Sequence, residues 1–547
     1  MARAPEAWSS RLGVIMAVAG SAVGLGNFLR FPGLAARYGS GAFMIAYFAA
    51  LLLIGIPICW AEWTVGRIGG SRGFHSSSGI FHALVRHPLG KYLGLLGFLV
   101  PVFIYMYYIV IEGWCLGYAL NFLAGNLDLG RGAAAYRDYF TSFTGAGADG
   151  VALAFSLGRA DLFLLIVFGL NLLIIYHGIT RGIETVCMWG MPALILIAFA
   201  LLVRVLTLGT PDPALPEQSL WNGLGYMWNP RDIAAGLARP ELWLAAAGQV
   251  FFTLSVGFGV IITYASYLTK KDDIVLSSLT ACSTNEFCEV VLGGMITVPA
   301  AFTFLGAAGI VGMGTFDLGF MVLPQVFATM HGGQAFGFLF FLLLFIAAIT
   351  SSLSMLQPGI AYLEEGLGLE RRQSVLFLGM ITAVGSFLVL YFSKDLKALD
   401  TIDFWVGTVG VFIQGTVLVI VFSWVLGVER GWEEAHHGAE IRIPRVFKPI
   451  LKYITPTFLI AIFALFLAGD VFGWNFSFTA PRFAPTARIT DLIGTADRPA
   501  NPVAIMCMVF IAIVTVFVAM LVGQSGHRWS RHAPSAPQTD GARSPSP

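Results

Sequence analysis

The sequence predicts an all-α membrane protein with twelve transmembrane helices. Apolar residues make up 57% of its 547 residues and charged residues only 12%, whereas soluble domains carry about 25% charged residues. The apolar residues gather into runs that are long enough to cross a bilayer. Two of these runs are interrupted by glycines and polar residues, which is the pattern of broken helices around a central binding site.

The expected spans follow one another with short loops between most of them. Their bounds, to within a few residues, are 11–36, 41–66, 91–124, 161–177, 189–209, 241–268, 275–306, 336–364, 374–392, 398–427, 449–473 and 501–523. With both chain ends in the cytoplasm, the inner segments hold more than half of the 32 lysines and arginines, as the positive-inside rule requires. We therefore expect a multi-pass protein of the inner (cytoplasmic) membrane with both termini in the cytoplasm.

The first span contains the clearest interruption, from Gly20 to Pro32 (Gly-Ser-Ala-Val-Gly-Leu-Gly-Asn-Phe-Leu-Arg-Phe-Pro). Glycines weaken the helix, and Asn27 and Arg30 place polar groups at membrane depth. A break of this kind is tolerated where the freed backbone groups face a ligand or an ion. Close packing of helices on small residues is the alternative, and the added polar side chains favour the binding site.

The sixth span is interrupted in a similar way between Gln249 and Gly259, where polar side chains and two glycines again fall at membrane depth. The first and sixth spans are corresponding members of two five-span units. Matched breaks therefore indicate two inverted repeats around one site, as in alternating-access transporters, whereas a channel does not need this symmetry. The predicted units are residues 1–210 and 241–427, followed by two spans in 447–524 and a disordered cytoplasmic tail, 525–547.

Further polar side chains lie in the seventh and eighth spans. Asn285 and Glu289 are four residues apart and so share one helix face. The eighth span is interrupted by Thr350-Ser351-Ser352. A lone hydroxyl in a membrane helix often bonds only to its own backbone, but three together, with Asn27 and Thr253 elsewhere, indicate a cation site. Oxygen ligands without clustered cysteines and histidines suit an alkali ion better than a transition metal.

Other function classes are disfavoured by the same sequence. A net charge of +1 gives no sign of a nucleic-acid partner. No Gly-rich phosphate loop, nucleophile elbow or paired His–Glu motif appears, so an enzyme is not expected. The six cysteines lie in or beside apolar segments and indicate no disulfide framework.

These features resemble the neurotransmitter:sodium symporter family, and most closely its bacterial leucine-transporter branch, from Trp8 to about Gln524. The motifs that carry the resemblance are Arg11-Leu-Gly, Gly24 to Pro32, Gly41-Ala-Phe to Tyr47, Gly248 to Ser255, Ile262 to Tyr267, Thr350-Ser-Ser and Asp400 to Trp405. The resemblance implies chloride-independent, sodium-coupled symport of a neutral, hydrophobic L-amino acid by alternating access, and it allows a homodimer. The alternatives are a sodium-independent amino-acid exchanger and a transporter-like receptor that binds without transport.

The resemblance also implies two sodium ions, whose charge would offset the carboxylate of the substrate. The first would be held by that carboxylate, the Ala22 carbonyl, Asn27, Thr253 and Asn285. The second would be held by the carbonyls of Gly20, Val23 and Ala347 and the hydroxyls of Thr350 and Ser351. Backbone amides near Leu25 and Gly26, at the start of a half-helix, would bind the substrate carboxylate.

The substrate pocket that the resemblance implies is mostly apolar. Its residues would be Ser21, Ala22, Leu25, Gly26, Ile104, Tyr108, Phe252, Thr253, Ser255, Phe258, Ser351 and Met355. Amine-transporting relatives carry an aspartate at the position of Gly24, where it binds the substrate ammonium. Glycine offers no such charge, so a substrate with its own carboxylate is favoured over a monoamine.

Glu289 stands where chloride-dependent relatives have a serine. Its expected neighbours are Tyr47, Gln249, Thr253 and Asn285. A fixed carboxylate there would supply the negative charge that chloride otherwise brings. A purely structural buried carboxylate is the alternative.

The gates of the family are matched in part. Arg30 and Asp403 would form a charged outer latch over an aromatic lid of Tyr108 and Phe252. The inner gate would comprise Trp8, Ser266, Tyr267 and Glu365. The arginine that relatives carry three residues before that tryptophan is Pro5 here, and Arg3 is the expected substitute.

Overall fold

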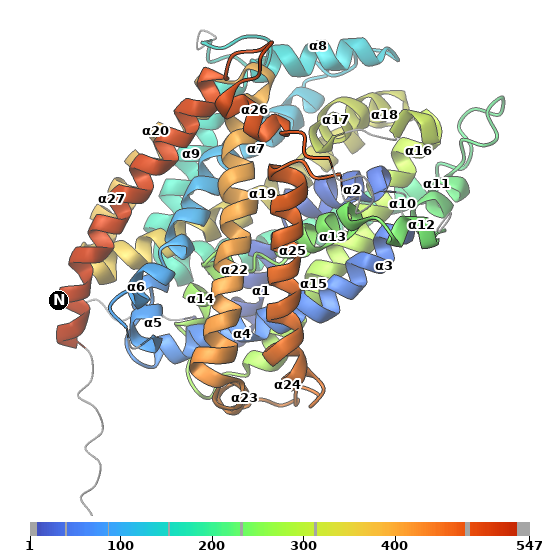
Figure 1. Cartoon of the computed structure of the whole chain (residues 1–547). Helices are drawn as coiled ribbons and strands as arrows, with labels where there is room; N and C mark the ends of the chain where they lie inside the picture. Colours follow the sequence, from blue (N-terminus) through green and yellow to red (C-terminus); the bar gives the residue numbers. More distant parts are fainter. Residues whose placement is uncertain are drawn as a thin grey trace, which may run out of the picture.

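The computed structural model describes residues 8–38, 41–85, 87–150, 154–229, 233–310, 314–475 and 482–532. These residues form an all-helical bundle, as predicted, in which the β-type pairing is one isolated bridge between Trp474 and Phe483. Figure 1 shows α22 (Val411–Ile420) and α25 (Thr455–Phe466) side by side, with α27 (Pro502–His532) inclined along one edge.

Nine helices among the described residues are long and apolar enough to cross a membrane. They are Gly41–Gly70, Gly90–Leu123, Ile179–Leu206, Ile274–Ile310, Gly333–Leu367, Arg371–Tyr391, Lys394–Ala435, Phe447–Gly469 and Pro502–Trp529. Arg11–Ala22 and Gly26–Tyr38, bent by 46°, form a tenth candidate. The apolar helix α9 (Ala160–Tyr176) is shorter, and the sixth expected span is divided into two helices. All twelve predicted runs therefore contain helix, whereas the number of spans stays a prediction.

The first predicted break is present, but it is shorter than the glycine pattern suggests. The helix α1 (Arg11–Ala22) includes Gly20 and is capped by Val23, and the chain resumes as a π-helical turn, η1 (Gly26–Arg30), that leads into α2 (Phe31–Tyr38). A Cβ on Gly20 would lie 3.0 Å from the sulfur of Cys187. Gly20 therefore serves close packing, and the chain leaves the helix only after it.

The second break separates α13 (Pro240–Thr253) from α14 (Val260–Ala265). Gly257 and Gly259 have φ values of +76° and +82°, which glycine adopts without strain. A Cβ at Gly259 would also lie 2.1 Å from the carbonyl oxygen of Gly97. The carboxylate of the buried Glu62, which the sequence did not single out, accepts a hydrogen bond from the Gly257 amide at 3.3 Å. The break is thus fixed by neighbouring backbone and by one carboxylate.

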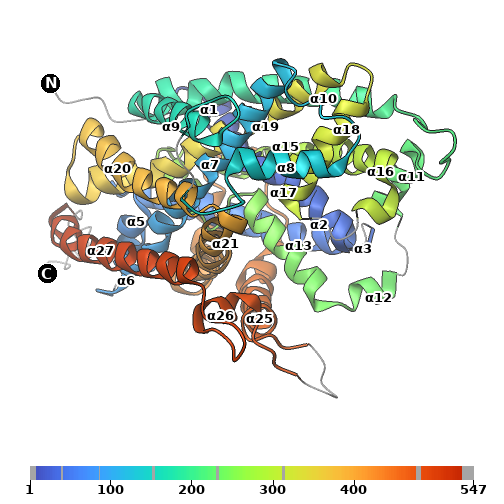
Figure 2. The same ribbon diagram turned by 90° about the horizontal axis from the view of Figure 1, so that it is seen from above.

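Two long helices pack against both breaks and against each other. They are α7 (Leu96–Leu123) and α19 (Gly333–Tyr362). Viewed from above, they lie near the middle of the molecule, while α9, α20 (Arg371–Tyr391) and α27 lie at its periphery (Figure 2). The region between the two breaks is therefore covered by α7 and α19.

The last helix corrects the predicted start of the tail. It continues to His532, past residue 525, and residues 533–547 lie outside the described part. Trp529 is buried against the rings of His82 and Tyr362. This aromatic contact explains why the helix extends beyond its apolar run.

Candidate functional site

A small pocket of about 10 Å³ lies between the two breaks. Its lining is Ser21, Ala22, Gly24, Gly26, Tyr108, Phe252, Thr253, Ser255, Phe258, Ser351 and Met355. This set holds all of the predicted pocket residues except Leu25 and Ile104, and it adds Gly24. Leu25 instead lines a second cavity, and Ile104 is fully buried in α7. Residues far apart in the sequence therefore converge as expected.

The second cavity, of about 150 Å³, adjoins the first at Gly26, Tyr108 and Phe252, which line both cavities. Tyr108 accepts a hydrogen bond from the Leu25 amide at 3.2 Å. Its ring and that of Phe252 therefore stand where the predicted lid requires them.

The predicted outer latch is not paired in this structure. Arg30 and Asp403 both line the larger cavity, but no ion pair within 4.0 Å joins them. The guanidinium carbon of Arg30 lies 4.5 Å from the Phe252 ring centre. Asp403 accepts a hydrogen bond from the Tyr107 hydroxyl at 2.5 Å. The two charges thus have other partners, and the cavity between them stays open.

The residues predicted for the first sodium ion meet at the edge of the small pocket. The side-chain oxygen of Asn285 lies 3.1 Å from the carbonyl oxygen of Ala22 and 3.3 Å from that of Thr253. The amide of Asn27 donates to the same oxygen of Asn285 at 2.8 Å. Three acceptor oxygens at this spacing repel one another unless the Asn285 amide turns its nitrogen toward the carbonyls or a cation lies among them.

The residues predicted for the second sodium ion also converge. The hydroxyl of Ser351 lies 3.2 Å from the carbonyl oxygen of Gly20, 3.4 Å from that of Val23 and 3.0 Å from that of Ala347. The carbonyl oxygen of Ser21, which was not predicted, is a fourth neighbour at 3.2 Å. One hydroxyl proton cannot satisfy four carbonyl oxygens. This surplus of acceptors is what a small cation needs.

Thr350 completes this second group. Its hydroxyl lies 3.1 Å from the carbonyl oxygens of Ile346 and Ala347 in its own helix. The side chain is fully buried. These contacts are the bonds to the helix's own backbone that the sequence allowed as an alternative. The Thr350 hydroxyl proton is therefore satisfied within α19, and its oxygen lies beside the Ala347 carbonyl of this group.

A buried carboxylate lies beside the first oxygen group. Glu289 accepts hydrogen bonds from Tyr47 at 2.6 Å, from Thr253 at 2.7 Å and from the Gln249 amide. Three of the four expected neighbours therefore bind the carboxylate, and the fourth, Asn285, bonds to Thr253 and Asn27. A second carboxylate, Glu286, was missed, although its oxygens lie 2.8 and 3.0 Å from the same Tyr47 hydroxyl. Glu286 precedes Glu289 by three residues, so the two share one helix face, and this spacing could have predicted it.

At the inner end of the molecule, Trp8 donates from its indole to the Tyr264 carbonyl at 3.1 Å. Tyr267 stacks on the ring of His75, with 4.5 Å between ring centres. Burial lowers the pKa of His75 below its usual value, which favours the neutral imidazole. Ser266 lies 3.0 Å from His75 Nδ1. Ser266 and Tyr267 of the predicted gate therefore both contact a histidine that the sequence had not indicated, whereas Trp8 bonds to Tyr264.

Glu365 is the fourth residue of the predicted inner gate. It accepts two hydrogen bonds from Ser76, one from the backbone amide and one from the hydroxyl, both at 2.8 Å. Arg3 and Pro5 lie outside the described residues. The proposed role of Arg3 therefore stays a prediction, while the carboxylate of Glu365 already has partners in the loop before α5 (Ser77–Leu84).

Comparison with known proteins gives consistent matches. A model of the "Sodium:neurotransmitter symporter family" matches residues 5–143 and 149–489. An uncharacterized sodium-dependent transporter of Haemophilus influenzae is 30% identical over 477 residues, which cover 84% of this chain and 97% of that protein. One of Methanocaldococcus jannaschii is 28% identical over 466 residues, covering 84% and 89%. The crystal structure of MhsT in complex with L-phenylalanine matches with a TM-score of 0.72 and 29% identity, covering 84% of this chain and 99% of that one.

Proposed function

Since the chain belongs to the sodium:neurotransmitter symporter family, and is therefore a sodium-dependent membrane transporter and not an enzyme, we propose that its substrate is a neutral, hydrophobic L-amino acid. The observation that carries this proposal is the small pocket between the two breaks. It joins an apolar lining to two groups of converging oxygens, one at Asn285 and one at Ser351. A solved relative of similar fold holds L-phenylalanine, which agrees with this substrate class.

The pocket favours a substrate that brings its own negative charge. At the break, the Leu25 amide donates to the hydroxyl of Tyr108, which lines the pocket. A carboxylate at this half-helix start would accept hydrogen bonds and would meet the positive end of the helix dipole. No side chain of the lining carries a charge, so an amine without a carboxylate would find no counter-charge there.

We further propose two sodium ions, one at each oxygen group. Asn27, Thr253, Asn285 and the Ala22 carbonyl would share the first ion with the substrate, and Ser351 would be central to the second. A shared ion makes the binding of substrate and of sodium mutually dependent. We also propose that Glu289 makes transport independent of chloride, because its carboxylate occupies the donors that would otherwise hold an anion.

Uptake into proteoliposomes tests this function. Purified protein is reconstituted, and a panel of labelled amino acids is offered with an inward sodium gradient or with potassium alone. We expect uptake of neutral hydrophobic amino acids only with the sodium gradient. Equal uptake in potassium would support the exchanger, binding without uptake would support the receptor, and preference for a monoamine would contradict the proposed substrate class.

Replacing Gly24 with alanine is expected to weaken substrate binding by about five- to 150-fold. An added Cβ would lie 2.8 Å from the Ser351 hydroxyl and 2.8 Å from the Tyr108 hydroxyl, and overpacking of this kind costs roughly 1–3 kcal/mol. Gly248→Ala is the matched control, because a Cβ there meets nothing within 4 Å. Equal substrate affinities of the two variants, measured by equilibrium binding, would show that the pocket does not depend on Gly24.

The remaining sequence predictions concern the surroundings of the protein. We propose the inner membrane as its location, cytoplasmic termini, a division into two inverted repeats at 1–210 and 241–427, and two additional spans in 447–524. The homodimer is likewise a proposal. Labelling of an introduced cysteine at the chain end from either side of the membrane tests the orientation.

A further inference from the structure

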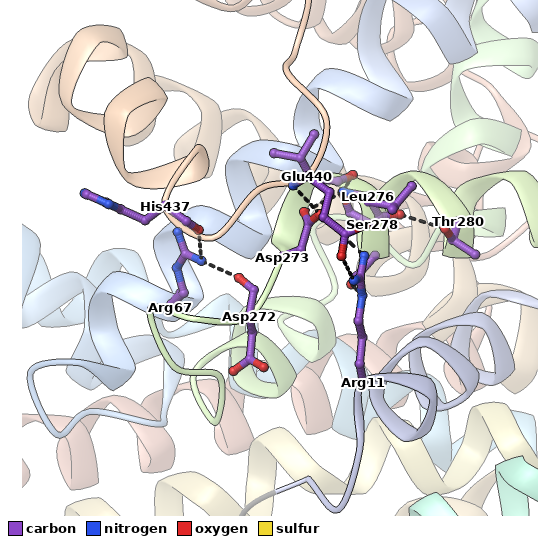
Figure 3. Close-up of polar contacts among 11 residues, drawn as sticks. Arg11, Arg67, Asp272, Asp273, Leu276, Ser278, Thr280, His437 and Glu440 are labelled. Atoms are coloured by element: carbon purple, nitrogen blue, oxygen red, sulfur yellow. Dashed lines mark hydrogen bonds and ion pairs between the residues drawn. The ribbon is translucent and has the colours of Figure 1, made fainter.

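A segment at the cytoplasmic end, residues 434–440, is bound to the end of α4 (Ile56–Gly70); it comprises the end of α23 (Val428–Ala435) and the loop that follows, and we call it the strap (Figure 3). The side chain of Arg67 in α4 is only 1% exposed. It contacts Glu434 at 3.0 Å and donates to the carbonyl oxygens of His437 at 3.0 Å and Asp272 at 2.8 Å. A guanidinium so buried and bonded fixes the strap to α4 and to the segment before α15 (Ile274–Glu286).

Backbone packing holds the middle of the strap as well. Gly438 has a φ of +75°, and a Cβ there would lie 2.7 Å from the carbonyl oxygen of Lys271 and 2.9 Å from that of Lys270. The chain can approach this closely because glycine has no side chain. The strap therefore lies against the loop that connects α14 to α15.

The end of the strap reaches the first residue of α1. The amide of Glu440 donates to Asp273 at 2.8 Å, and the other oxygen of Asp273 caps α15 by accepting from the Leu276 amide at 2.9 Å. The carboxylate of Glu440 binds Arg11 at 2.5 Å, and Arg11 also lies 3.4 Å from Asp273. Figure 3 shows Arg11 directed at this pair from α1. One arginine thus joins α1 to the strap and to α15.

We infer that the strap fastens the inner end of α1, so that this half-helix leaves the strap and α15 only after Arg11 releases Glu440. The inference rests on the proposed alternating access, in which the inner half of the first broken helix must move. The outer end of α1 carries the Gly20 and Val23 carbonyls of the second oxygen group. A restraint on its inner end therefore acts on the element that shapes the ion site.

The size of the effect follows from the exposure of the pair. The Arg11 side chain is 36% exposed and that of Glu440 is 62% exposed, and exposed ion pairs have small effects. We therefore expect a two- to fivefold change in the opening of the inner end rather than loss of the fold. The buried anchor at Arg67 is left untouched by changes at Glu440.

A native cysteine can report this opening. Cys187, in α10 (Thr185–Leu206), is buried, and a Cβ added to Gly20 of α1 would lie 3.0 Å from its sulfur. Its reaction with a membrane-impermeant maleimide is measured in inside-out vesicles, and labelled peptides are identified by mass spectrometry. We expect Glu440→Gln to speed the labelling of Cys187 about two- to fivefold. Glu429→Gln is the matched control, because Glu429 binds Lys448 in the same loop region.

A reversible cross-link gives an independent test. In Arg11→Cys/Glu440→Cys, a short bifunctional methanethiosulfonate should stop sodium-driven uptake, and a reductant should restore it. The same reagent on Glu429→Cys/Lys448→Cys links neighbouring parts of one loop and should leave uptake unchanged. Unchanged labelling of Cys187 in Glu440→Gln, or full uptake by the cross-linked pair, overturns the strap. Absence of uptake by the unmodified protein contradicts the proposed function instead, and the labelling assay still tests the strap.

Discussion

Replacing Asn27 with alanine is expected to weaken sodium binding and amino-acid binding together, each by roughly 10- to 150-fold. The Asn27 side chain accepts from the Gly24 amide at 2.8 Å and donates to Asn285 at 2.8 Å. It therefore both shapes the first break and orients a proposed sodium ligand. Leaving a buried group without its hydrogen-bond partner costs about 1–3 kcal/mol, and most of that interval corresponds to this range of affinity.

The joint loss is the informative part of this result. If one ion is shared by Asn27, Asn285 and the substrate carboxylate, a change in the affinity for either ligand must appear in the affinity for the other. Titrations of purified protein measure substrate affinity at several sodium concentrations and sodium affinity at several substrate concentrations. Asn27→Asp keeps the oxygen that accepts from the Gly24 amide but loses the NH2 group that donates to Asn285, so we expect a smaller joint loss than in Asn27→Ala. Loss of only one affinity in Asn27→Ala would contradict a shared ion.

The sequence predicted both breaks because they depend on local composition. Glycines and polar residues that cluster within an otherwise apolar span are unusual, and the sequence alone reveals them. The limits of the first break were harder to predict. Gly20 belongs to α1 because it packs against Cys187, and the chain leaves the helix where Asn27 binds the Gly24 amide. The position of the first break is therefore set by tertiary contacts and not by helix propensity.

The candidate site could be predicted where a family motif marks the residue. Most of the pocket residues and both oxygen groups converge as the resemblance implied. Glu62, His75 and the strap escaped prediction because their partners are remote along the chain, as with Arg11 and Glu440, which are 429 residues apart. The absence of an ion pair between Arg30 and Asp403 escaped prediction for a different reason. A transporter adopts several conformations with one sequence, so the state of its latch cannot be read from that sequence.

Replacing Glu289 with serine is expected to make transport depend on chloride. The Gln249 amide that now binds the carboxylate would be left without that acceptor in a buried site, which is costly. Tyr47 and Thr253 would each lose one hydrogen bond but would keep Glu286 and Asn285 as neighbours. A chloride ion would restore both the missing negative charge and the acceptor for these donors. Thr253 is also a proposed sodium ligand, so the loss of charge acts directly on the first ion site.

Sodium-driven uptake by Glu289→Ser is measured in chloride and in gluconate. We expect at least tenfold faster uptake in chloride, while the unmodified protein shows equal rates in both. Glu286→Gln is the matched control, because Glu286 shares Tyr47 with Glu289 but accepts no hydrogen bond from Gln249 or Thr253. Its uptake should stay independent of chloride. If Glu289→Ser transports equally well in gluconate, the carboxylate has a structural role and does not replace an anion.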